Sequence, residues 1–432
     1  MKLIQVLLHF LMFFSLILSK TCFSLNQSII LQLKTKQIPS VTILRAPNKL
    51  SFQHNVSLTV SLTVGSPPQE ATMVLDTGSE LSWLHCKRTP NTPLAFDPSV
   101  SSSYTPVPCS SATCRTRTQD FSIPVSCDPK NLCHVVLSYA DASSVEGNLA
   151  AETFRVENSS LPQMVFGCMD TSSSSNPEDS KTSGLIGMNQ GSLSFVSQMG
   201  PGKFSYCIPG RDSSGVLLLG EMVLPWLKPL SYTPLVHVTT KLPYFDQVAY
   251  TVQLEGIRVG TTVLPQPKSA YVPDHTGAGQ TMVDSGTQFT FLLGPVYNSL
   301  KNEFSRQMKG ILRQLEDPDF VFQGAMDLCY RVELSKTILP SLPSVTLMFQ
   351  GGVEMSVGGG DKLLYKVSGI TRENDQVYCF TFGSSDLLGI EAFVIGHHHQ
   401  QNLWMEFDLA KSRLGLAEVR CDLASQRLGV PH

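Results

Sequence analysis

The chain has little charge and, past its first residues, no long apolar stretch. Of its 432 residues 16% are charged, and the formal net charge is −3. This balance gives no reason to expect a nucleic acid or an anionic membrane as partner. No stretch after residue 24 is apolar enough to span a bilayer, so we expect no membrane insertion. Abundant Gly, Pro, Ser and Thr favour a β-rich, turn-rich protein over a helical one.

The first residues have the pattern of a targeting segment. Lys2 precedes an apolar run over about residues 6–18, and Ser24 suits the position before a cleavage site. This pattern predicts a secretory signal peptide over residues 1–24. An uncleaved anchor is the alternative, but the run is short for a bilayer span and His9 interrupts it.

No two cysteines have the Cys-x-x-Cys spacing of a metal knuckle. The sequence has eleven, and Cys22 would leave with the signal peptide, so an even ten remain, as an oxidised protein requires. Three Asn-x-Ser glycosylation sequons, whose use the sequence leaves open, suit the same route: Asn26, Asn55 and Asn158. We therefore expect a protein of the secretory pathway.

Two motifs each occur twice, in the same order. The stretch MVLDTGSELSWL around Asp76 is echoed by TMVDSGTQFTFL around Asp284, and SGLIGMNQGSLSF around Ile186 by AFVIGHHHQQNLW around Ile395. From Asp76 to Ile186 the chain advances 110 residues, and from Asp284 to Ile395 it advances 111. Because chance rarely produces agreement at both motifs, we expect two copies of one fold unit.

Most other segments have strand patterns, such as VSLTVSLTV and LPSVTLMF. A helix is predicted over Pro295–Met308, with Pro in its first turn and apolar residues on one face, and a short helix at SLSFVSQM. The polar residues 170–184 are predicted to form a solvated loop. We expect an N-terminal lobe over 52–224 and a C-terminal lobe over 225–432, which meet around 221–229.

The repeated aspartates suggest a chemistry. One carboxylate at a strand end is ordinary, but two in equivalent places of related lobes can face each other across a cleft. Asp76 and Asp284 would then share a proton, because two carboxyl groups in contact cannot both ionise cheaply; aspartic proteases are the standard example of this effect. The ionised group can take a proton from water while the protonated group donates to a carbonyl oxygen. This permits peptide hydrolysis without a metal or a covalent intermediate.

The neighbours of each aspartate can support this role. Glycines let amide groups approach the carboxylates, one pair of hydroxyls can join the two loops, and another pair can hold the outer carboxylate oxygens. In that order, these residues are Gly78 and Gly286, Thr77 and Ser285, and Ser79 and Thr287. Either Asp-[Ser/Thr]-Gly motif taken alone is more simply explained as a turn at a strand end.

Both motifs resemble those of the pepsin-like aspartic proteases, and the resemblance extends from about Val60 to Cys421. VGSPPQEATMVLDTGSELSW resembles the family's first active-site strand, SYADASSVEGNLAAETF its flap, and the two Ile-Gly segments the stretches that thread behind each catalytic loop. FDPSVSSSYTPVPCSSATC and FSYC are similar to the plant nepenthesin-like, or atypical, branch. The resemblance implies a mainly all-β, bilobal double β-barrel with a few short helices and an active site in the cleft between the lobes.

The resemblance also implies residue roles. Asp76 and Asp284 correspond to the catalytic dyad, and Tyr139 to the flap tyrosine, which closes over substrate and can hydrogen-bond the indole of Trp83. A hairpin aromatic and a core tryptophan are the plainer interpretations of the last two residues.

The flap and the cysteines depart from the family pattern. Ala140 and Ala142 stand where the family has glycines, which predicts a stiffer or differently twisted flap. Relatives carry several cysteines after the tryptophan, whereas this chain keeps only Cys86. The family likeness implies two of the pairs, with the remaining cysteines paired inside the first lobe, although sequence alone does not settle the connectivity. These implied pairs are Cys207 with Cys421 and Cys329 with Cys379.

Three adjacent histidines, His397–His399, lack the spacing of a closed zinc site, because neighbours on a strand point to opposite faces. Since the family has polar residues here, we expect structural packing behind the second catalytic loop. No metal and no cofactor are expected.

The stretch Leu25–Lys49 contains four basic residues and no acidic one. We expect residues 25–51 to be a leader or a short removable prosegment, whose cations cover the acidic cleft until lower pH weakens the attraction. An unstructured basic leader is the alternative.

The sequence therefore predicts a monomeric aspartic endopeptidase that acts on an extended polypeptide. We expect it outside the cell, in the apoplast, or in the endoplasmic reticulum, and the resemblance suggests a part in plant developmental cell-death control. A catalytically silent inhibitor or binding protein on the same fold, like the plant xylanase inhibitors, is one alternative, which the two intact motifs disfavour. A cell-wall structural or carbohydrate-binding glycoprotein is another.

Overall fold

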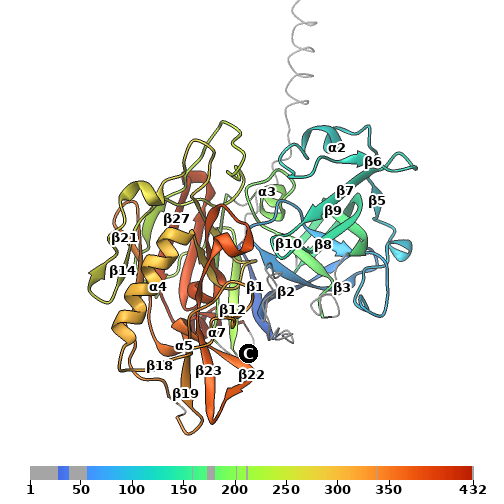
Figure 1. Ribbon diagram of the computed structural model, residues 1–432. Coiled ribbons are helices and arrows are strands. Elements are labelled where there is room, and N and C mark those ends of the chain that lie inside the picture. The colour runs from blue at the N-terminus through green and yellow to red at the C-terminus, as the bar shows by residue number, and fades with distance from the viewer. Residues whose placement is uncertain are drawn as a thin grey trace, which may run out of the picture.

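The computed structural model describes residues 28–37, 56–157, 159–172, 181–200, 202–210, 213–336 and 338–430. These residues form two strand-rich lobes that stand side by side (Figure 1). In that view the N-terminal lobe, in blue and green, lies on the right, and the C-terminal lobe, in yellow to red, on the left. The predicted bilobal, mainly β architecture is thereby confirmed. The predicted signal peptide and the three sequons lie outside the described residues.

One large sheet runs through both lobes. From one edge to the other its strands are β13 (Ser231–Pro234), β27 (Arg413–Glu418), β26 (Leu403–Asp408), β11 (Lys203–Cys207), β12 (Ser214–Leu219), β1 (Ile29–Gln37), β2 (Val56–Val64), β3 (Gln69–Asp76), β10 (Gly184–Gly187), β4 (Trp83–His85), β9 (Ser159–Ser172), β8 (Ser144–Val156), β7 (Cys133–Ser138) and β6 (Ser126–Cys127), while β5 (Thr105–Pro106) pairs with β8. The chain passes between the lobes after β12 and before β13, in a stretch that includes the expected join at 221–229.

Three smaller sheets belong to the C-terminal lobe. The first has the strand order β15 (Thr262–Val263), β14 (Leu254–Val259), β20 (Val345–Phe349) and β21 (Val353–Val357). The second has the order β16 (Gln280–Asp284), β25 (Ala392–Gly396), β17 (Thr290–Leu292) and β24 (Phe382–Ser384). The third has the order β18 (Arg313–Gln314), β19 (Cys329–Glu333), β23 (Asp375–Phe380) and β22 (Leu364–Arg372).

The helices are few and mostly short. They are α2 (Ala112–Thr116), α3 (Phe195–Met199), α4 (Gly294–Met308), α5 (Gly360–Leu363), α6 (His397–Gln400) and α7 (Cys421–Arg427), with 3₁₀ turns at Pro98–Val100, Lys268–Tyr271, Ser385–Leu388 and Leu409–Lys411. Among the described residues, none of the helices has the length and apolar character needed to cross a membrane.

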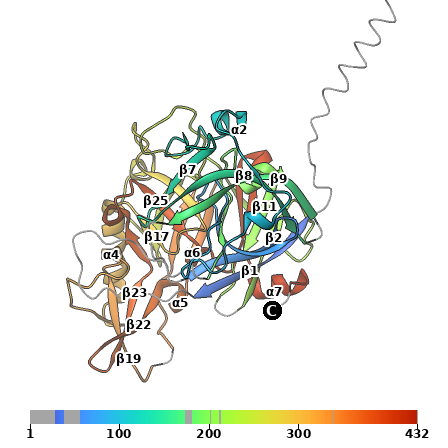
Figure 2. The same cartoon turned by 90° about the vertical axis from the view of Figure 1, so that its right-hand side faces the viewer.

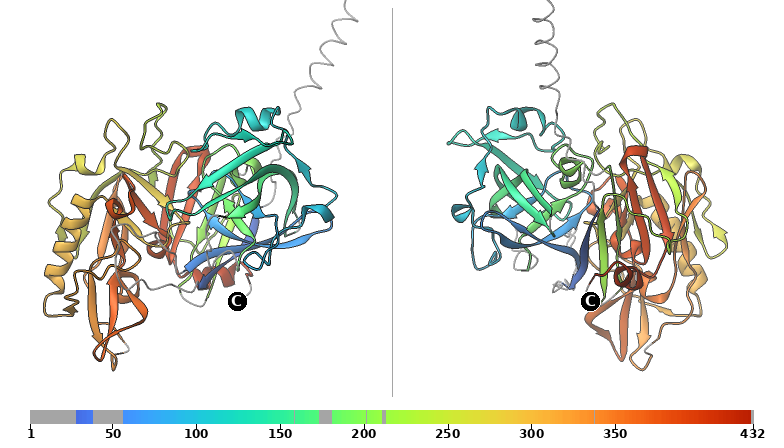
Figure 3. Two further views of the ribbon diagram at one scale, coloured as in Figure 1. Left: turned by 45° about the vertical axis from the view of Figure 1, so that its right-hand side comes forward. Right: turned by 180° about the vertical axis from the view of Figure 1, so that it is seen from behind.

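The helix predicted from the sequence over Pro295–Met308 is confirmed as α4. Figure 3 shows it on the outer side of the C-terminal lobe, where its buried face holds Leu300, Phe304 and Met308. The shorter predicted helix is present as α3. The prediction of a loop over 170–184 was wrong at both ends. Residues 170–172 are the end of β9, which is hydrogen-bonded to β8, and residue 184 is the start of β10, which is hydrogen-bonded to β3. Residues 173–180 lie outside the described part of the chain.

Strand β1 connects the two parts of the large sheet. It pairs with β12 along one edge and with β2 along the other, and Figure 2 shows β1 and β2 side by side. Its apolar side chains, Ile29, Leu31 and Leu33, are buried in a core that extends through both lobes. The predicted leader over 25–51 therefore includes a strand of the folded protein. Removal of that stretch stays a prediction, and it would take a buried strand out of the sheet.

We expect the substitution Leu33→Ala to lower the free energy of unfolding by about 2–5 kcal/mol, because the fully buried Leu33 side chain would leave a cavity. Lys34→Ala in the same strand removes an exposed side chain and should have little effect. Thermal or denaturant unfolding of both variants tests this. Equal stability of the two would contradict the structural role of β1.

Candidate active site

The two predicted aspartates end equivalent strands. Asp76 is the last residue of β3, and the parallel strand β10 places Gly187 opposite it. Asp284 is the last residue of β16, and the parallel strand β25 places Gly396 opposite it. The repeat found in the sequence is thus a repeat of structure, with each Ile-Gly segment beside its catalytic loop.

Reciprocal hydrogen bonds join the two loops. The Thr77 amide donates to Ser285 Oγ (3.0 Å), and the Ser285 amide donates to Thr77 Oγ1 (2.8 Å). Each hydroxyl then donates onward into the opposite lobe, from Thr77 to the carbonyl of Val283 (3.3 Å) and from Ser285 to that of Leu75 (3.0 Å). All four residues come from strand ends or loops of different lobes, so these bonds fix the distance between the aspartates.

Each carboxylate is held by two donors from its own loop. One carboxylate oxygen accepts the amide of the glycine two residues after the aspartate. The other oxygen accepts the hydroxyl of the residue three after the aspartate. The donors are Gly78 N (2.7 Å) and Ser79 Oγ for Asp76, and Gly286 N (2.9 Å) and Thr287 Oγ1 (2.6 Å) for Asp284.

The two glycines also make room for the opposite carboxylate. A Cβ atom on Gly286 would lie 2.3 Å from Asp76 Oδ1, and one on Gly78 would lie 3.0 Å from Asp284 Oδ1. The carboxyl groups therefore approach each other over the paired loops. Burial, followed by the charge of Asp284, raises the pKa of Asp76 well above its ordinary value. The pair can thus hold one proton under conditions in which isolated aspartates would hold none.

The hairpin between β7 and β8 carries Tyr139 over the dyad. The indole Nε1 of Trp83 donates to the Tyr139 hydroxyl (2.6 Å), so the tryptophan is both a core residue and an anchor of the flap. Burial and the charge of Asp76 raise the pKa of Tyr139 well above its ordinary value, which keeps the phenol neutral. At the tip, Ala142 has a φ of +64°, a conformation that favours glycine.

A cavity of about 340 Å³ lies over the dyad and takes walls from both lobes. Its lining includes the dyad, Tyr139, Trp83, Asp246 and His397. The predicted catalytic, flap and supporting residues are therefore brought together at one place.

Two amide side chains support the loops and were missed by sequence reasoning. Asn189 Nδ2 donates to the carbonyl of Gly78 (3.2 Å), and Gln400 Nε2 donates to the carbonyl of Asp284 (3.3 Å). Tyr206 in turn donates to Gln400 Oε1 (2.5 Å). Asn189 follows Ile186 by three residues and Gln400 follows Ile395 by five, so the signal that could have revealed them is an amide residue shortly after each Ile-Gly segment.

The three histidines form helix α6 and are buried behind the second catalytic loop. Thr381 Oγ1 donates to the carbonyl of Lys362 (2.6 Å), which assigns the proton of the contact between His399 Nε2 and Thr381 (2.8 Å) to the imidazole. His399 Nδ1 then accepts from Thr290 Oγ1 (2.6 Å). Burial lowers the pKa of His399 well below its ordinary value, in keeping with this neutral, fully bonded ring.

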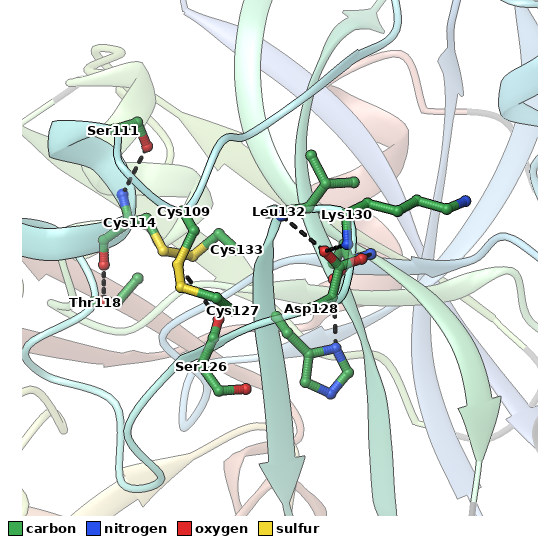
Figure 4. The surroundings of a disulfide bond; sticks show 12 residues. Cys109, Ser111, Cys114, Thr118, Ser126, Cys127, Asp128, Lys130, Leu132 and Cys133 are labelled. Atoms are coloured by element: carbon green, nitrogen blue, oxygen red, sulfur yellow. Dashed lines mark hydrogen bonds between the residues drawn. A yellow bond between two sulfur atoms is a disulfide. The ribbon is translucent and has the colours of Figure 1, made fainter.

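All ten cysteines in the described residues form disulfides. Of the two pairs implied by the family likeness, one joins β11 to α7 and the other joins β19 to β23. The other three lie in the N-terminal lobe, where Cys86 is bonded to a cysteine of β9. The pairs are Cys207–Cys421, Cys329–Cys379, Cys86–Cys168, Cys109–Cys127 and Cys114–Cys133. Figure 4 shows the last two next to each other.

Comparison with known proteins agrees with this geometry. Residues 58–221 match the family described as "Xylanase inhibitor N-terminal", and residues 249–418 match "Xylanase inhibitor C-terminal". The chain is 62% identical to aspartic proteinase PCS1 of Arabidopsis thaliana, over 93% of this chain and 90% of that protein. It is 30% identical to aspartic proteinase nepenthesin-2 of Nepenthes gracilis, over 84% of this chain and 77% of that protein.

Two solved structures share the fold. The crystal structure of edgp superimposes with a TM-score of 0.67 at 19% identity, over 93% of this chain and 96% of the other. Basic 7S globulin from soybean gives a TM-score of 0.63 at 19% identity, over 90% and 96%.

The fold and the paired carboxylates define an aspartic-type endopeptidase. The chain belongs to the pepsin-like aspartic proteases, in their plant atypical, nepenthesin-like branch.

Gly286→Ala tests the space between the lobes. The new methyl group would meet Asp76 Oδ1 at 2.3 Å and push the carboxylates apart, so we expect kcat to fall at least about 100-fold in a folded protein. Gly358→Ala is the matched control, because the nearest atom to its Cβ would be 3.9 Å away. Peptidase assays of both variants measure the difference. A fully active Gly286→Ala enzyme would contradict the close approach.

The flap offers a pair of substitutions with opposite expected signs. Ala142→Gly should raise the melting temperature slightly, because glycine adopts the positive φ without the cost of about 1 kcal/mol that alanine bears. Ala140→Gly, where φ is not positive, should lower it through the greater freedom of the unfolded chain. Calorimetry on both variants decides, and a shift of the same sign in both would refute the strain at Ala142.

Proposed function

We propose that this protein hydrolyses peptide bonds by activating a water molecule between Asp76 and Asp284. The observation that carries the proposal is the close approach of two carboxyl groups from separate lobes, of which Asp76 is buried and Asp284 is partly buried. The ionised carboxylate would accept a proton from the water, and the protonated carboxyl group would donate to the carbonyl oxygen of the substrate. Since the loops hold both groups in place before substrate binds, little reorganisation is needed during the reaction.

The substrate would be an extended polypeptide that lies in the 340 Å³ cavity under Tyr139. Backbone groups of the peptide would pair with the flap strands, and its side chains would enter pockets on alternate sides. The neutral phenol of Tyr139 would close over the peptide and exclude bulk water.

The five disulfides support a location in an oxidising compartment, either the apoplast or the endoplasmic reticulum. We further propose that the enzyme acts as a monomer and takes part in the control of developmental cell death, as expected from the sequence resemblance. Loss of Asp76 in the plant should then alter the timing of that cell death, and an unchanged timing would contradict the role.

A catalytically silent protein on the same fold is the second candidate. The match to families described as xylanase inhibitors favours it. Against it stand both intact motifs, with every carboxylate donor in place. Peptide cleavage by the purified protein separates the two.

The deciding assay compares the wild-type protein with Asp76→Asn on a peptide library across acidic pH. We expect cleavage that pepstatin inhibits in the wild type and none above background in the variant, because an amide cannot serve as the base. Absence of cleavage by the properly folded wild type at every pH would favour the silent candidate.

The raised pKa of Asp76 also predicts how stability depends on pH. A carboxyl group that stays protonated in the fold contributes stability below its unfolded pKa of about 4, and this contribution is lost as the pH rises through the folded value. Asp76→Asn cannot ionise, so its melting temperature relative to wild type should increase from about pH 3 to pH 7. Asp319→Asn, at an exposed position, is the control and should show no such trend.

A further inference from the structure

The chain between β13 and β14 forms a loop over residues 236–249, which we call the strap. Its base is closed by the Val236 amide, which donates to the carbonyl of Thr251 (2.8 Å). Two of its residues, Asp246 and Ala249, line the catalytic cavity. The strap thus supplies part of the wall against which a substrate would lie.

The C-terminal lobe fixes the shape of the strap from one side. The Asp246 amide donates to Gln280 Oε1 (2.8 Å), and Gln280 Nε2 donates back to the carbonyl of Asp246 (2.7 Å). Phe245 is buried, and a Cβ atom on Gly277 would lie 2.6 Å from its Cβ atom, so the strap packs closely on the lobe. This part of the wall is therefore in place before a substrate binds.

The end of the strap is bonded to the N-terminal lobe. The Gln190 amide donates to the carbonyl of Val248 (2.8 Å), and the side-chain Nε2 of Gln190 donates to the carbonyl of Ala249 (3.0 Å). Directly after the strap, the hydroxyl of the buried Tyr250 donates to the carbonyl of Met188 (2.6 Å). These bonds join consecutive residues of one lobe to a single short segment of the other.

The segment that makes these bonds also supports the first catalytic loop. The Met188 amide donates to the carbonyl of Asp76 (2.8 Å), and the Asn189 amide donates to the carbonyl of Ser79 (3.1 Å). The side chain of Asn189 adds its bond to the carbonyl of Gly78 (3.2 Å). The segment therefore connects the loop that holds one catalytic aspartate to a wall of the cavity that belongs to the opposite lobe.

A second contact between the lobes lies further along the strap. Lys241 Nζ donates to the carbonyl of Gln119 (3.5 Å), in the loop that follows α2 of the N-terminal lobe. Neither Lys241 nor Gln190 lines the catalytic cavity, whereas Asp246 of the strap does. The contacts between the lobes thus lie behind the wall of the cavity. Because they bridge the two lobes there, the cleft does not continue past them.

The side chain of Gln190 is the part of this junction that a substitution can remove. Its main-chain bond to Val248 persists when the side chain is changed, whereas the bond to Ala249 comes from Nε2. Ala249 is buried, so loss of this donor costs free energy unless the wall shifts. Since Ala249 also lines the cavity, such a shift would change the surface offered to a substrate.

We propose that the strap forms the end wall of the substrate cleft on one side of the scissile bond, and that Gln190 is the positioning residue that holds this wall in place relative to Asp76. The inference rests on the proposed peptidase function. A peptide on this side would make its last contacts with Asp246 and Ala249 before its chain turns out into solvent. The affinity that this part of the peptide contributes would therefore depend on Gln190.

Peptides of increasing length test the proposal. One cleaved sequence is extended by one residue at a time, separately at each end and with both ends blocked, and kcat/KM is measured for every length. At one point on one side of the scissile bond, we expect an added residue to raise the wild-type kcat/KM at least about five-fold, as for a new hydrogen-bonded contact. A wild type that cleaves these peptides but gains nothing from extension on either side overturns the proposal. If it cleaves no peptide of any length, the proposed function itself fails.

Gln190→Ala should reduce this gain to less than about two-fold, because the wall is no longer held where the added residue binds. Gln307→Ala is the matched control and should keep the wild-type gain. Its half-buried amide also donates to a backbone carbonyl, that of Val259 (2.9 Å), but from α4 on the outer side of the lobe. If Gln190→Ala lowers kcat/KM by the same factor for every length, the side chain is merely structural and the proposal is overturned.

Gln190→Glu gives a reversible version of the test, which stands even if Gln190→Ala does not fold. Its protonated carboxyl group can donate to the carbonyl of Ala249, whereas the ionised form cannot. The gain should therefore be present at low pH and disappear as the pH rises through the pKa of the carboxyl group, ordinarily about 4.3. The charged groups near this position, Glu80, Asp120 and Asp246, are shared with the wild type, whose gain over the same pH range is the control. A gain that follows the wild type at every pH contradicts the role of the bond.

Discussion

The structure depends on one constraint: two carboxyl groups must be kept in contact inside a buried cleft. Left alone, the charges would separate the lobes or draw in water, because each carboxylate loses hydration. The reciprocal bonds between Thr77 and Ser285 prevent this by tying one loop to the other. The glycines at the turns then admit the opposite carboxylate. Catalytic competence is therefore a property of the interface between lobes and not of either lobe alone.

The sequence predicted this centre because the fold repeats. An Asp-Thr-Gly triplet is uninformative by itself, but a second copy at matched spacing implies a second lobe, and two lobes imply opposed aspartates. Strand patterns and helix α4 were predictable for a related reason, since their signals are local. The short helix at His397 was not, because one turn of helix leaves no periodicity, and its burial depends on packing against Thr290 and Thr381.

The less predictable features depend on contacts between distant residues. The basic stretch before residue 51 was expected to be a leader, yet its strand fills the gap between β12 and β2, which pattern alone cannot reveal. Glu80 has ordinary neighbours in sequence. It acquires a pKa of about 7 only because folding brings Asp120 and Asp246 beside it and removes water. Such environments have no signature in a single sequence.

One physical effect thus acts at several places in the cleft. Burial raises the pKa of Asp76, Glu80 and Tyr139 together, so all three favour their neutral forms. For Asp76 the consequence is a shared catalytic proton, and for Tyr139 a neutral flap. Glu80 differs because its pKa lies at about 7, so it can gain charge near neutrality while Tyr139 keeps its proton. A cleft that is desolvated for catalysis thereby acquires, beside the dyad, a group whose charge depends on the compartment in which the enzyme works.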